Sequence, residues 1–318
     1  MREILTAGRY YRKKFGCNVY KVPISILGFT CPNIDGTVAK GGCTFCENES
    51  FSPNLTEKAQ KKFYLNPNSV ENPQLENQLL QLENQFKYTK KRLAKKFGAK
   101  KFIVYFQSFS NTYAPLETLK ALYERALSLD DVVGLSIGTR TDSITDETLD
   151  YLKELSTDKE IWVEYGIQSV YDETLDAINR GHSVANMFEW IKKTKDRGLK
   201  VCGHLIYGLP NETQEMMLDS VTASIGLKID SLKLHSMYIT NNTIMANEYK
   251  QGKIKTISQE LYIDTVVKTI KMLPKNIMIQ RVCAGINDKS LLAPQWCRDK
   301  HSQMKQIKDA LKKEGILY

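Results

Sequence analysis

The sequence predicts an α/β protein built on parallel strands. Short runs rich in β-branched and aromatic residues recur six times, with helix-length stretches between them. A β-α order repeated in this way implies parallel strands with right-handed crossovers, and therefore a doubly wound sheet or a barrel, whole or partial. The 318 residues would allow two domains, but α/β barrels of about 250 residues form one.

The first expected strand reads YKVPISI, and the five after it are similarly rich in Val, Ile, Leu and aromatic residues. Between the strands, apolar residues such as Leu119, Leu122 and Ala126 repeat at helical spacing. In chain order we expect strands at 20–26, 101–106, 132–137, 160–166, 200–207 and 231–237, and helices at 74–97, 116–129, 146–155, 172–197 with a break around Gly181, and 214–227.

The pattern changes beyond residue 243. There we expect a helix at 258–273, a short apolar run at 277–282 and a basic terminal helix at 295–313. Residues 1–17 form a basic and aromatic N-terminal segment, and the Asn- and Gln-rich stretch 55–85 is typical of an exposed insertion.

The composition is that of an ordinary globular protein. With 42% hydrophobic and 25% charged residues it excludes disordered and fibrous classes. The N-terminus has no apolar signal region and no run approaches the roughly 20 apolar residues of a bilayer span, so we expect a cytoplasmic protein without a membrane partner. The net charge of +9 permits a polyanionic partner without requiring one.

The segments that follow the expected strands are polar and rich in glycine. In both sheet architectures the ligand site lies at the carboxyl ends of the strands. We therefore expect the chemistry on that rim, where Cys31, Gln107, Arg140 and Gln168 follow the first four strands.

Three of the seven cysteines lie in one loop, spaced Cys31-x11-Cys43-x2-Cys46. Cys43 and Cys46 share a turn, and glycines at 36, 41 and 42 let the backbone fold back toward Cys31. A structural zinc site needs a fourth protein ligand, which would have to be Cys17 or a distant histidine. A cubic iron–sulfur cluster accepts three cysteines if a small molecule binds the fourth iron.

Five segments carry a family resemblance: CPNIDGTVAKGGCTFCENESFSP at the cysteines, FQSFSNTYAP after the second strand, GTRTDSI after the third, YGIQSVYDETLDAINRGH after the fourth and HLIYGLPNET at the fifth. Together they resemble the radical S-adenosylmethionine (SAM) superfamily. The usual superfamily spacing is C-x3-C-x2-C, whereas the long gap here is that of the YhcC/YtqA-type proteins, which the chain resembles along nearly its whole length. More remotely, the core is similar to the Elongator catalytic subunit and to oxygen-independent coproporphyrinogen oxidases.

The resemblance implies a partial (β/α)6 TIM-type barrel of the radical SAM type over residues 18–243, which includes the insertion, and a C-terminal extension over 244–318 that covers it. It also implies a [4Fe-4S] cluster on Cys31, Cys43 and Cys46, with SAM on the open iron. Reduction of this pair yields a 5′-deoxyadenosyl radical that removes hydrogen from a substrate. An electron donor such as flavodoxin or ferredoxin is then a further partner.

Other residues match SAM contacts of the relatives. Phe45 is placed like the aromatic beside the SAM adenine, Gln168 like a SAM-binding glutamine, and Arg180 like the arginine that pairs with the SAM carboxylate. The remaining candidates are Gln107 and Ser108 in place of an absent Gly-Gly-Glu segment, Arg140 beside Thr139, and Gly208 and Pro210 near the adenine. No catalytic residue is assigned; His204, Cys283 and Arg281 are candidates.

The distribution of charge along the chain indicates which class of substrate the protein could bind. Residues 87–101 carry eight Lys or Arg and no acid, and RYYRKKF at 9–15 interleaves aromatic and basic side chains, as suits contacts with nucleic-acid phosphates and bases. The resemblance implies tRNA: conversion of 5-carboxymethylaminomethyl-uridine at the wobble position to 5-aminomethyl-uridine. One alternative is a radical SAM oxidase or decarboxylase of a small molecule such as a porphyrin precursor. Another is a non-catalytic, zinc-stapled RNA-binding module.

Overall fold

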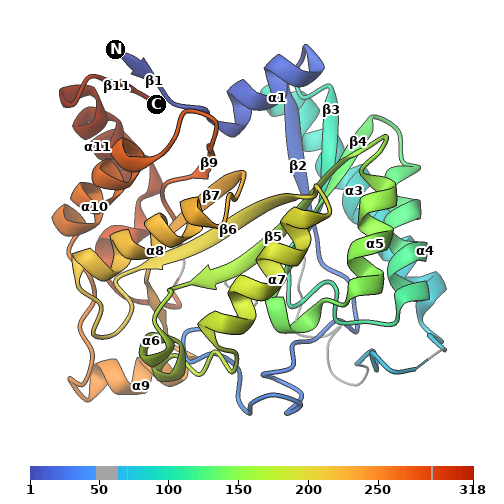
Figure 1. Ribbon diagram of the computed structural model, residues 1–318, viewed down its shortest axis with the longest axis horizontal. Coiled ribbons are helices and arrows are strands. Elements are labelled where there is room, and N and C mark those ends of the chain that lie inside the picture. The colour runs from blue at the N-terminus through green and yellow to red at the C-terminus, as the bar shows by residue number, and fades with distance from the viewer. Residues whose placement is uncertain (48–63, 70, 288) are drawn as a thin grey trace.

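The centre of the molecule is a curled sheet of seven parallel strands (Figure 1). The computed structural model describes residues 1–47, 64–69, 71–287 and 289–318. Neighbouring strands follow the order β2-β3-β4-β5-β6-β7-β9, so that each new βα unit adds to the same edge of the sheet. The strands are β2 (Val19–Ile24), β3 (Lys101–Phe106), β4 (Val132–Thr139), β5 (Glu160–Gln168), β6 (Lys200–Tyr207), β7 (Ser231–Ser236) and β9 (Met278–Arg281).

The predicted partial α/β barrel is confirmed, with one addition. All six expected strands form, and their ends lie within two residues of the expected positions. The apolar run at 277–282 supplies a seventh strand, β9, which pairs in parallel with β7. The six-unit barrel is thus extended by a strand from the C-terminal part of the chain. Its four residues are too few to show a strand periodicity in the sequence.

Helices cover the outer face of the sheet (Figure 1). The predicted break near Gly181 is present, because one helix ends at Ala177 and the next begins at Val184 after its N-cap Ser183. The helices of the barrel are α3 (Leu75–Phe97), α4 (Leu116–Leu127), α5 (Asp146–Leu155), α6 (Asp172–Ala177), α7 (Val184–Asp196) and α8 (Gln214–Gly226).

The expected insertion at 55–85 needs correction in its second part. Residues 75–85 form the first half of α3 and pack on the barrel, with Leu82 fully buried. Their glutamines bind the chain beyond β2: Gln85 accepts from Ser25 N at 2.9 Å and donates to Ser25 O at 2.8 Å. The glutamines that face the barrel thus serve backbone contacts, whereas Asn77 and Asn84 on the other side of α3 are exposed. Residues 55–63 lie outside the described residues.

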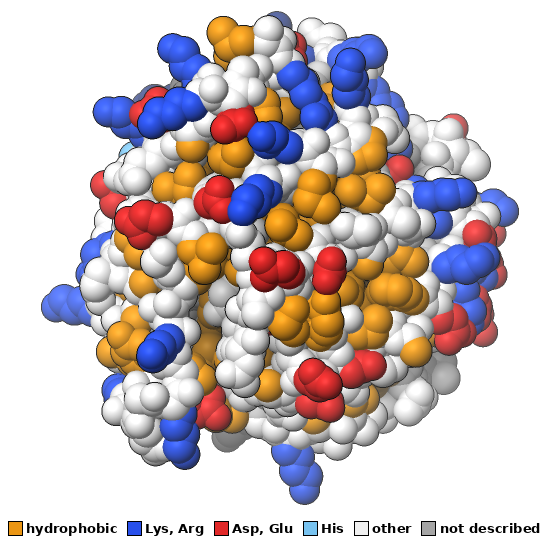
Figure 2. Space-filling view, turned by 60° about the vertical axis from the view of Figure 1, so that its left-hand side comes forward, with side chains coloured by type: hydrophobic (Ala, Val, Ile, Leu, Met, Phe, Trp, Pro, Cys, Tyr) orange, Lys and Arg blue, Asp and Glu red, His pale blue; other side chains and the backbone are white. Residues whose placement is uncertain are grey.

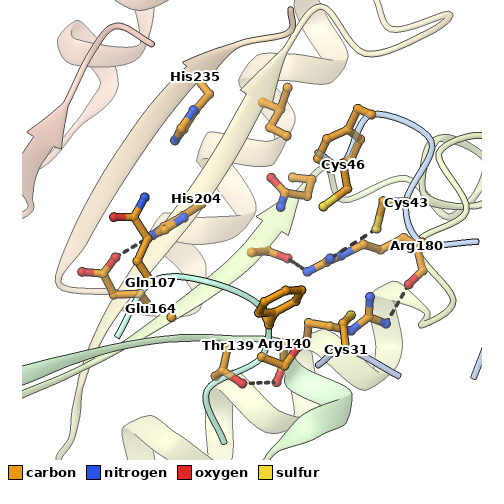
Figure 3. A pocket seen from close by; sticks show the side chains of 18 of the residues that line it. Cys31, Cys43, Cys46, Gln107, Thr139, Arg140, Glu164, Arg180, His204 and His235 are labelled. Carbon is orange, nitrogen blue, oxygen red and sulfur yellow. Dashed lines mark hydrogen bonds and ion pairs between the residues drawn. The ribbon is translucent and has the colours of Figure 1, made fainter. Parts of the chain in front are cut away.

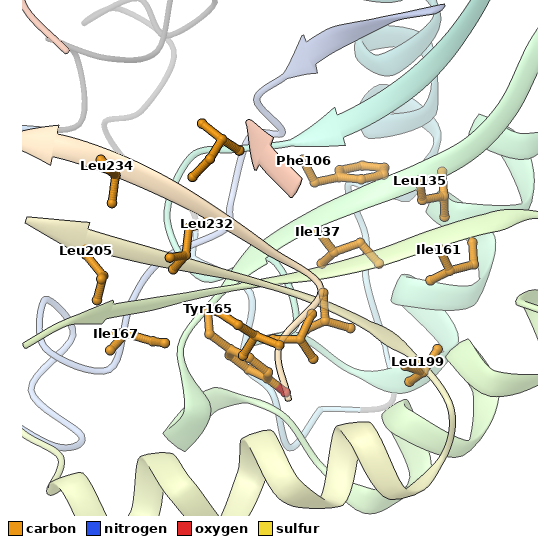
Figure 4. Packing of buried hydrophobic residues seen from close by; sticks show 14 of the residues in the cluster. Phe106, Leu135, Ile137, Ile161, Tyr165, Ile167, Leu199, Leu205, Leu232 and Leu234 are labelled. Atoms are coloured by element: carbon orange, nitrogen blue, oxygen red, sulfur yellow. The ribbon is translucent and has the colours of Figure 1, made fainter. Parts of the chain in front are cut away.

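The outer face of the strands carries the core (Figure 4). Ile137, Tyr165 and Leu205 are buried between sheet and helices, and the Tyr165 hydroxyl lies 2.8 Å from Thr194 Oγ1 on α7. Each such side chain contributes about 1.5–3 kcal/mol of transfer free energy. Because strand side chains alternate, the residues between them, among them Ser136 and Glu164, point into the barrel.

The C-terminal part packs α9 (Ile244–Lys250), α10 (Gln259–Met272) and α11 (Lys300–Lys313) beside the barrel, and β8 (Ile239–Thr240) pairs with β10 (Leu291–Ala293). The expected helix at 295–313 is divided: a 3-10 turn covers Gln295–Arg298, and α11 starts after Asp299, whose side chain caps it. Helix α1 (Ala7–Phe15) packs near β9. The two ends of the chain pair as β1 (Arg2–Glu3) with β11 (Ile316–Leu317).

Among the described residues, no helix combines the length and the apolar character that a bilayer span requires.

Candidate active site

A pocket of about 220 Å³ opens at the carboxyl ends of the barrel strands. It is lined by the loop after β2 and by residues at or near the ends of β3 to β7 and β9. The three cysteines lie on one side of it, and His204 and His235 lie on the other (Figure 3). We call these sides the cysteine end and the histidine end. The candidates that line the pocket are Cys31, Cys43, Phe45, Cys46, Gln107, Arg140, Gln168, Arg180, His204 and Arg281.

Four candidates lie outside the lining residues. Ser108 is buried with its hydroxyl 2.7 Å from that of Ser25. Gly208 adopts a φ of +87° and packs against Ile257, where an added Cβ would lie 2.5 Å from the Ile257 Cβ. Pro210 and Cys283 are likewise absent from the lining, although Cys283 is buried nearby in the C-terminal part. For Ser108, Gly208 and Pro210 a role in cofactor binding stays a prediction, and for Cys283 a catalytic role stays one.

The cysteine loop folds back as its glycines suggest. Gly36, Gly41 and Gly42 all have φ between +78° and +88°, a region that suits glycine. Cys46 N donates to Cys43 O at 2.9 Å, which places both residues on one turn. The loop therefore presents Cys31, Cys43 and Cys46 to one pocket.

Two asparagines fasten this loop to the segment between α6 and α7. Asn33 Nδ2 donates to Asn179 O at 2.6 Å and to Arg180 O at 2.9 Å. In return, Asn179 Nδ2 donates to Lys40 O at 3.0 Å and to Gly42 O at 2.8 Å. Sequence reasoning missed both residues, because such reciprocal contacts join positions almost 150 residues apart.

The sulfur of Cys43 receives two N–H groups. Arg180 Nη1 and Asn33 Nδ2 each lie 3.6 Å from it. Burial, together with the neighbouring Cys43 and Cys31, raises the pKa of the Cys46 thiol above its ordinary value. The two donors at Cys43 offset negative charge on its sulfur. This donor set fits an iron–sulfur cluster.

Gly166 brings Arg180 and Gln168 together beside the cysteines. An added Cβ at this position would lie 2.7 Å from Arg180 Nη2 and 2.7 Å from Gln168 Nε2. Arg180 Nη2 donates to Gly166 O at 2.8 Å. Gln168 has a φ of +67°, at the end of β5 where the pairing with β6 shifts register. This backbone turns the Gln168 side chain toward the pocket.

Arg140 is held by a carboxylate and a carbonyl. Its Nε donates to Asp142 Oδ1 at 2.7 Å, and its Nη2 donates to Arg180 O at 2.7 Å. Burial opposes ionisation of Asp142, but the hydrogen bonds from Arg140 hold its pKa below the usual value. Arg140 therefore stays fixed, with its Nη1 buried and without a partner among the described residues.

The histidine end contains a charged network inside the barrel. Glu164 Oε1 accepts from Lys21 and Ser136, and its Oε2 accepts from Lys233 and from His204 Nε2, the last at 2.7 Å. Burial would raise the pKa of Glu164, but Lys21 and Lys233 hold it well below its ordinary value. The fully buried carboxylate is thus ionised.

Sequence reasoning named His204 but missed Lys21, Glu164 and Lys233. A signal was present: each is a charged residue within a run that must be buried on both faces of a parallel sheet. The carboxylate, Cys202 and His204 also lie close enough to hold a metal. Lys21 and Lys233 already neutralise the charge of Glu164, so we assign this carboxylate to the ion network and not to a metal site.

Comparison with known proteins agrees with this geometry. The model of the radical SAM superfamily matches residues 35–223, and the model of the radical SAM C-terminal domain matches residues 229–313. The chain belongs to the radical SAM superfamily. It is a radical SAM enzyme whose cofactors are a [4Fe-4S] cluster and SAM. This membership excludes the alternative of a non-catalytic, zinc-stapled RNA-binding module.

Relatives at about one-third identity cover nearly the whole chain. Uncharacterized protein YtqA of Bacillus subtilis is 34% identical over 98% of this chain and 90% of its own length, and protein YhcC of Escherichia coli is 33% identical over 96% and 91%. The predicted kinship with YhcC/YtqA-type proteins is confirmed. The tRNA uridine(34) acetyltransferase of Methanocaldococcus infernus is 29% identical over 47% of this chain and 28% of its own length.

One solved structure shares the fold. Methanocaldococcus infernus Elp3, with its N-terminus deleted, superposes with a TM-score of 0.62 at 18% identity, over 93% of this chain and 63% of that chain.

The residues beside the cysteines fit SAM as well as the cluster. The buried polar atoms without a partner among the described residues include Gln168 Oε1, which accepts, and Arg140 Nη1 and Arg180 Nε, which donate. The amino acid part of SAM has an amino group that donates and a carboxylate that accepts. One acceptor and two donors in a pocket that also holds the cysteines match these groups.

Proposed function

We propose that this radical SAM enzyme modifies the carbon-5 side chain of wobble uridine in tRNA, converting 5-carboxymethylaminomethyl-uridine to 5-aminomethyl-uridine. The observation that carries the proposal is the likeness to the tRNA uridine(34) acetyltransferase. That likeness covers about half of this chain, and position 34 of tRNA is the wobble position. The pocket adds the guanidinium of Arg281 at its histidine end, where a carboxylate on the substrate would find opposite charge.

In this proposal Cys31, Cys43 and Cys46 hold the cluster. When bound, the cluster and SAM supply a 5′-deoxyadenosyl radical that takes a hydrogen atom from a substrate carbon. Arg180 and Asn33 donate to a cluster thiolate, and Phe45 lines the same pocket, whereas Gln107 lies beside His204 at the histidine end (Figure 3).

Arg140, Arg180 and Gln168 orient the amino acid part of SAM through their unpaired buried atoms. Gly208 and Pro210 contribute backbone shape further along the rim. A flavodoxin or ferredoxin delivers the electron to the cluster from outside the cysteine loop.

The substrate is tested by nucleoside profiling of tRNA. Cells that lack the gene are expected to accumulate 5-carboxymethylaminomethyl-uridine, and the wild-type gene is expected to restore 5-aminomethyl-uridine and its products. A copy with Cys43→Ala serves as the inactive control. An unchanged wobble-uridine profile rejects the tRNA function, and salt-insensitive activity without tRNA binding favours the small-molecule alternative.

The cluster assignment has its own test in anaerobically purified protein. Cys43→Ala and Cys46→Ala are expected to lose most of the roughly four irons per chain, whereas Cys17→Ala is expected to keep them. Cys17 is the matched control because it is partly exposed and lies outside the pocket. Wild-type iron content in the Cys43 and Cys46 variants would reject these residues as ligands.

A further inference from the structure

The charges at the histidine end do not balance. Arg281 lines this end, and Lys21 and Lys233, which do not line the pocket themselves, bring two further positive charges to Glu164; among the described residues Glu164 is the one carboxylate that lines the pocket. Its two oxygens already accept from both lysines, from Ser136 and from His204. No acceptor capacity is left for Arg281, so the network itself carries one excess positive charge and Arg281 adds a second.

Arg281 is half-buried at the end of β9 and has no carboxylate partner among the described residues. Its Nη2 lies 3.3 Å from His235 Nδ1, and its Nε is buried without a partner. A guanidinium can only donate, so Nδ1 of His235 accepts, and the neutral ring carries its proton on Nε2. Burial, together with Arg281, lowers the pKa of His235 well below its ordinary value, which keeps the ring neutral.

An uncompensated guanidinium in a half-buried site costs free energy unless an anion joins it. The anion cannot be the carboxylate of SAM if SAM binds beside the cysteines, because the cysteine and histidine ends lie on opposite sides of the pocket (Figure 3). The anion therefore belongs to the substrate. A guanidinium favours a planar carboxylate, which it binds through two parallel N–H groups.

We propose that Arg281, positioned by His235, binds the carboxylate of the substrate at the histidine end and thereby selects substrates whose side chain carries one. The proposal deepens the function proposed above and rests on it for the identity of that carboxylate, the carboxymethyl group of the modified uridine. Arg281 is then the specificity-determining residue that separates substrate from product, since 5-aminomethyl-uridine lacks the carboxylate.

The test compares two anticodon stem-loops, one with 5-carboxymethylaminomethyl-uridine at the wobble position and one with 5-aminomethyl-uridine. Their dissociation constants are measured on the cluster-loaded enzyme with SAM, under anaerobic conditions and without reductant. Wild-type protein is expected to prefer the carboxylate-bearing stem-loop by roughly tenfold to a hundredfold. Arg281→Gln is expected to abolish this preference by weakening that stem-loop alone, and Arg281→Lys to restore part of it.

The matched control is Arg298→Gln, since Arg298 is an exposed arginine of the same C-terminal part that does not line the pocket. It is expected to keep the full preference. A preference that survives in Arg281→Gln, or that falls equally in Arg298→Gln, overturns the proposal while leaving the tRNA function intact.

A second probe separates this proposal from the tRNA function. N-methylglycine reproduces the end of the substrate side chain, and its binding is measured by calorimetry on the same cluster-loaded proteins. Binding to wild type that is lost in Arg281→Gln supports the carboxylate site even where tRNA profiling fails. Failure of wild type both to bind N-methylglycine and to discriminate between the stem-loops overturns the site.

Discussion

At the residue scale, Gly166 decides whether Arg180 and Gln168 can share one place beside the cysteines. Its missing side chain leaves the room that Arg180 Nη2 and Gln168 Nε2 occupy. The position looks ordinary in the sequence, because a glycine at the end of a strand usually serves a turn. Here it serves a close approach of two side chains.

Gly166→Ala is expected to weaken SAM binding by about tenfold or more, because the methyl group displaces both side chains. Equilibrium dialysis with labelled SAM measures the effect, and the iron content is expected to stay at the wild-type level. Gly226→Ala, where an added Cβ meets nothing within 4 Å, is the control. Equal SAM affinity in the two variants would contradict this role of Gly166.

His204 makes stability depend on pH. Burial, together with Lys233, lowers its pKa to about 4. Between this value and about 6.5 the unfolded chain binds a proton that the folded chain refuses, so the free energy of unfolding falls as the pH falls through that window. The contribution of this ring is fully present above about pH 6.5.

Urea unfolding of the anaerobic protein between pH 7 and pH 5 tests this dependence. One such histidine gives a slope of up to roughly 1.4 kcal/mol per pH unit below its unfolded pKa. His204→Gln is expected to flatten the profile by that amount, whereas a change at the exposed His301, His301→Gln, is expected to leave it unaltered. Parallel profiles for wild type and His204→Gln would reject the assignment.

At the element scale, α3 fixes the chain segment that leads into the cysteine loop. Gln81 Oε1 accepts from Leu27 N at 2.8 Å, and Gln78 Nε2 donates to Leu27 O at 2.6 Å. Gln85 binds the backbone of Ser25 through both the oxygen and the nitrogen of its side-chain amide. These side chains satisfy backbone groups that no neighbouring strand can reach.

Gln85→Ala is expected to lower the free energy of unfolding by about 1–3 kcal/mol, because two buried backbone groups of Ser25 lose their partner. Chemical denaturation measures the change. Asn84→Ala, one position away on the exposed side of α3, is the control and is expected to change stability by less than about 0.5 kcal/mol. A similar loss in both variants would mean that helix propensity, and not the hydrogen bonds of Gln85 to Ser25, causes the loss of stability.

The sequence predicts most elements, since periodicity reports which face of a strand or helix is buried. It predicts the rim of the pocket too, because parallel strands place their carboxyl ends together. It does not predict contacts between distant segments, such as Asn33 with Asn179, or the pairing of Glu164 with Lys21. β9 was not predicted as a strand, because its apolar run is short and becomes a strand only by pairing with β7.

At the scale of the whole molecule, basic side chains gather away from the pocket. Residues 87–101 cover the last part of α3 and the start of β3, at the amino ends of the strands, and Lys101 lies 5.6 Å from the ring of Phe15 on α1. The six-residue strand β3 places this region about 20 Å from the rim. By contrast, basic, acidic and apolar side chains are interspersed over much of the face that Figure 2 turns forward.

If the wobble base of a tRNA enters the pocket, the basic residues can contact only those parts of the tRNA that lie about 20 Å or more from this base. We therefore expect full-length tRNA to bind more tightly than the anticodon stem-loop, and Lys91→Gln with Lys95→Gln to remove most of that difference. The double variant is also expected to reduce the dependence of affinity on salt by about one to two counterions. Filter binding at several salt concentrations measures both.

The control is the pair Lys153→Gln and Lys228→Gln, two exposed lysines outside this basic region. It is expected to leave the affinities of tRNA and stem-loop unchanged. Equal binding of tRNA and stem-loop by the wild-type enzyme would remove the basic region from tRNA recognition.

The late position of β9 also sets an order of events during synthesis. Met245 N donates to Thr44 O at 2.9 Å, so the cysteine loop has this contact once residue 245 has emerged. Arg281 emerges about 36 residues later, and β9 then docks on the N-terminal segment, where Ile279 N donates to Leu5 O at 2.8 Å. At ribosomal rates of about 5–20 residues per second, this leaves an interval of roughly 2–7 s. Iron–sulfur assembly can therefore meet the cysteine loop with this contact made before Arg281 has emerged.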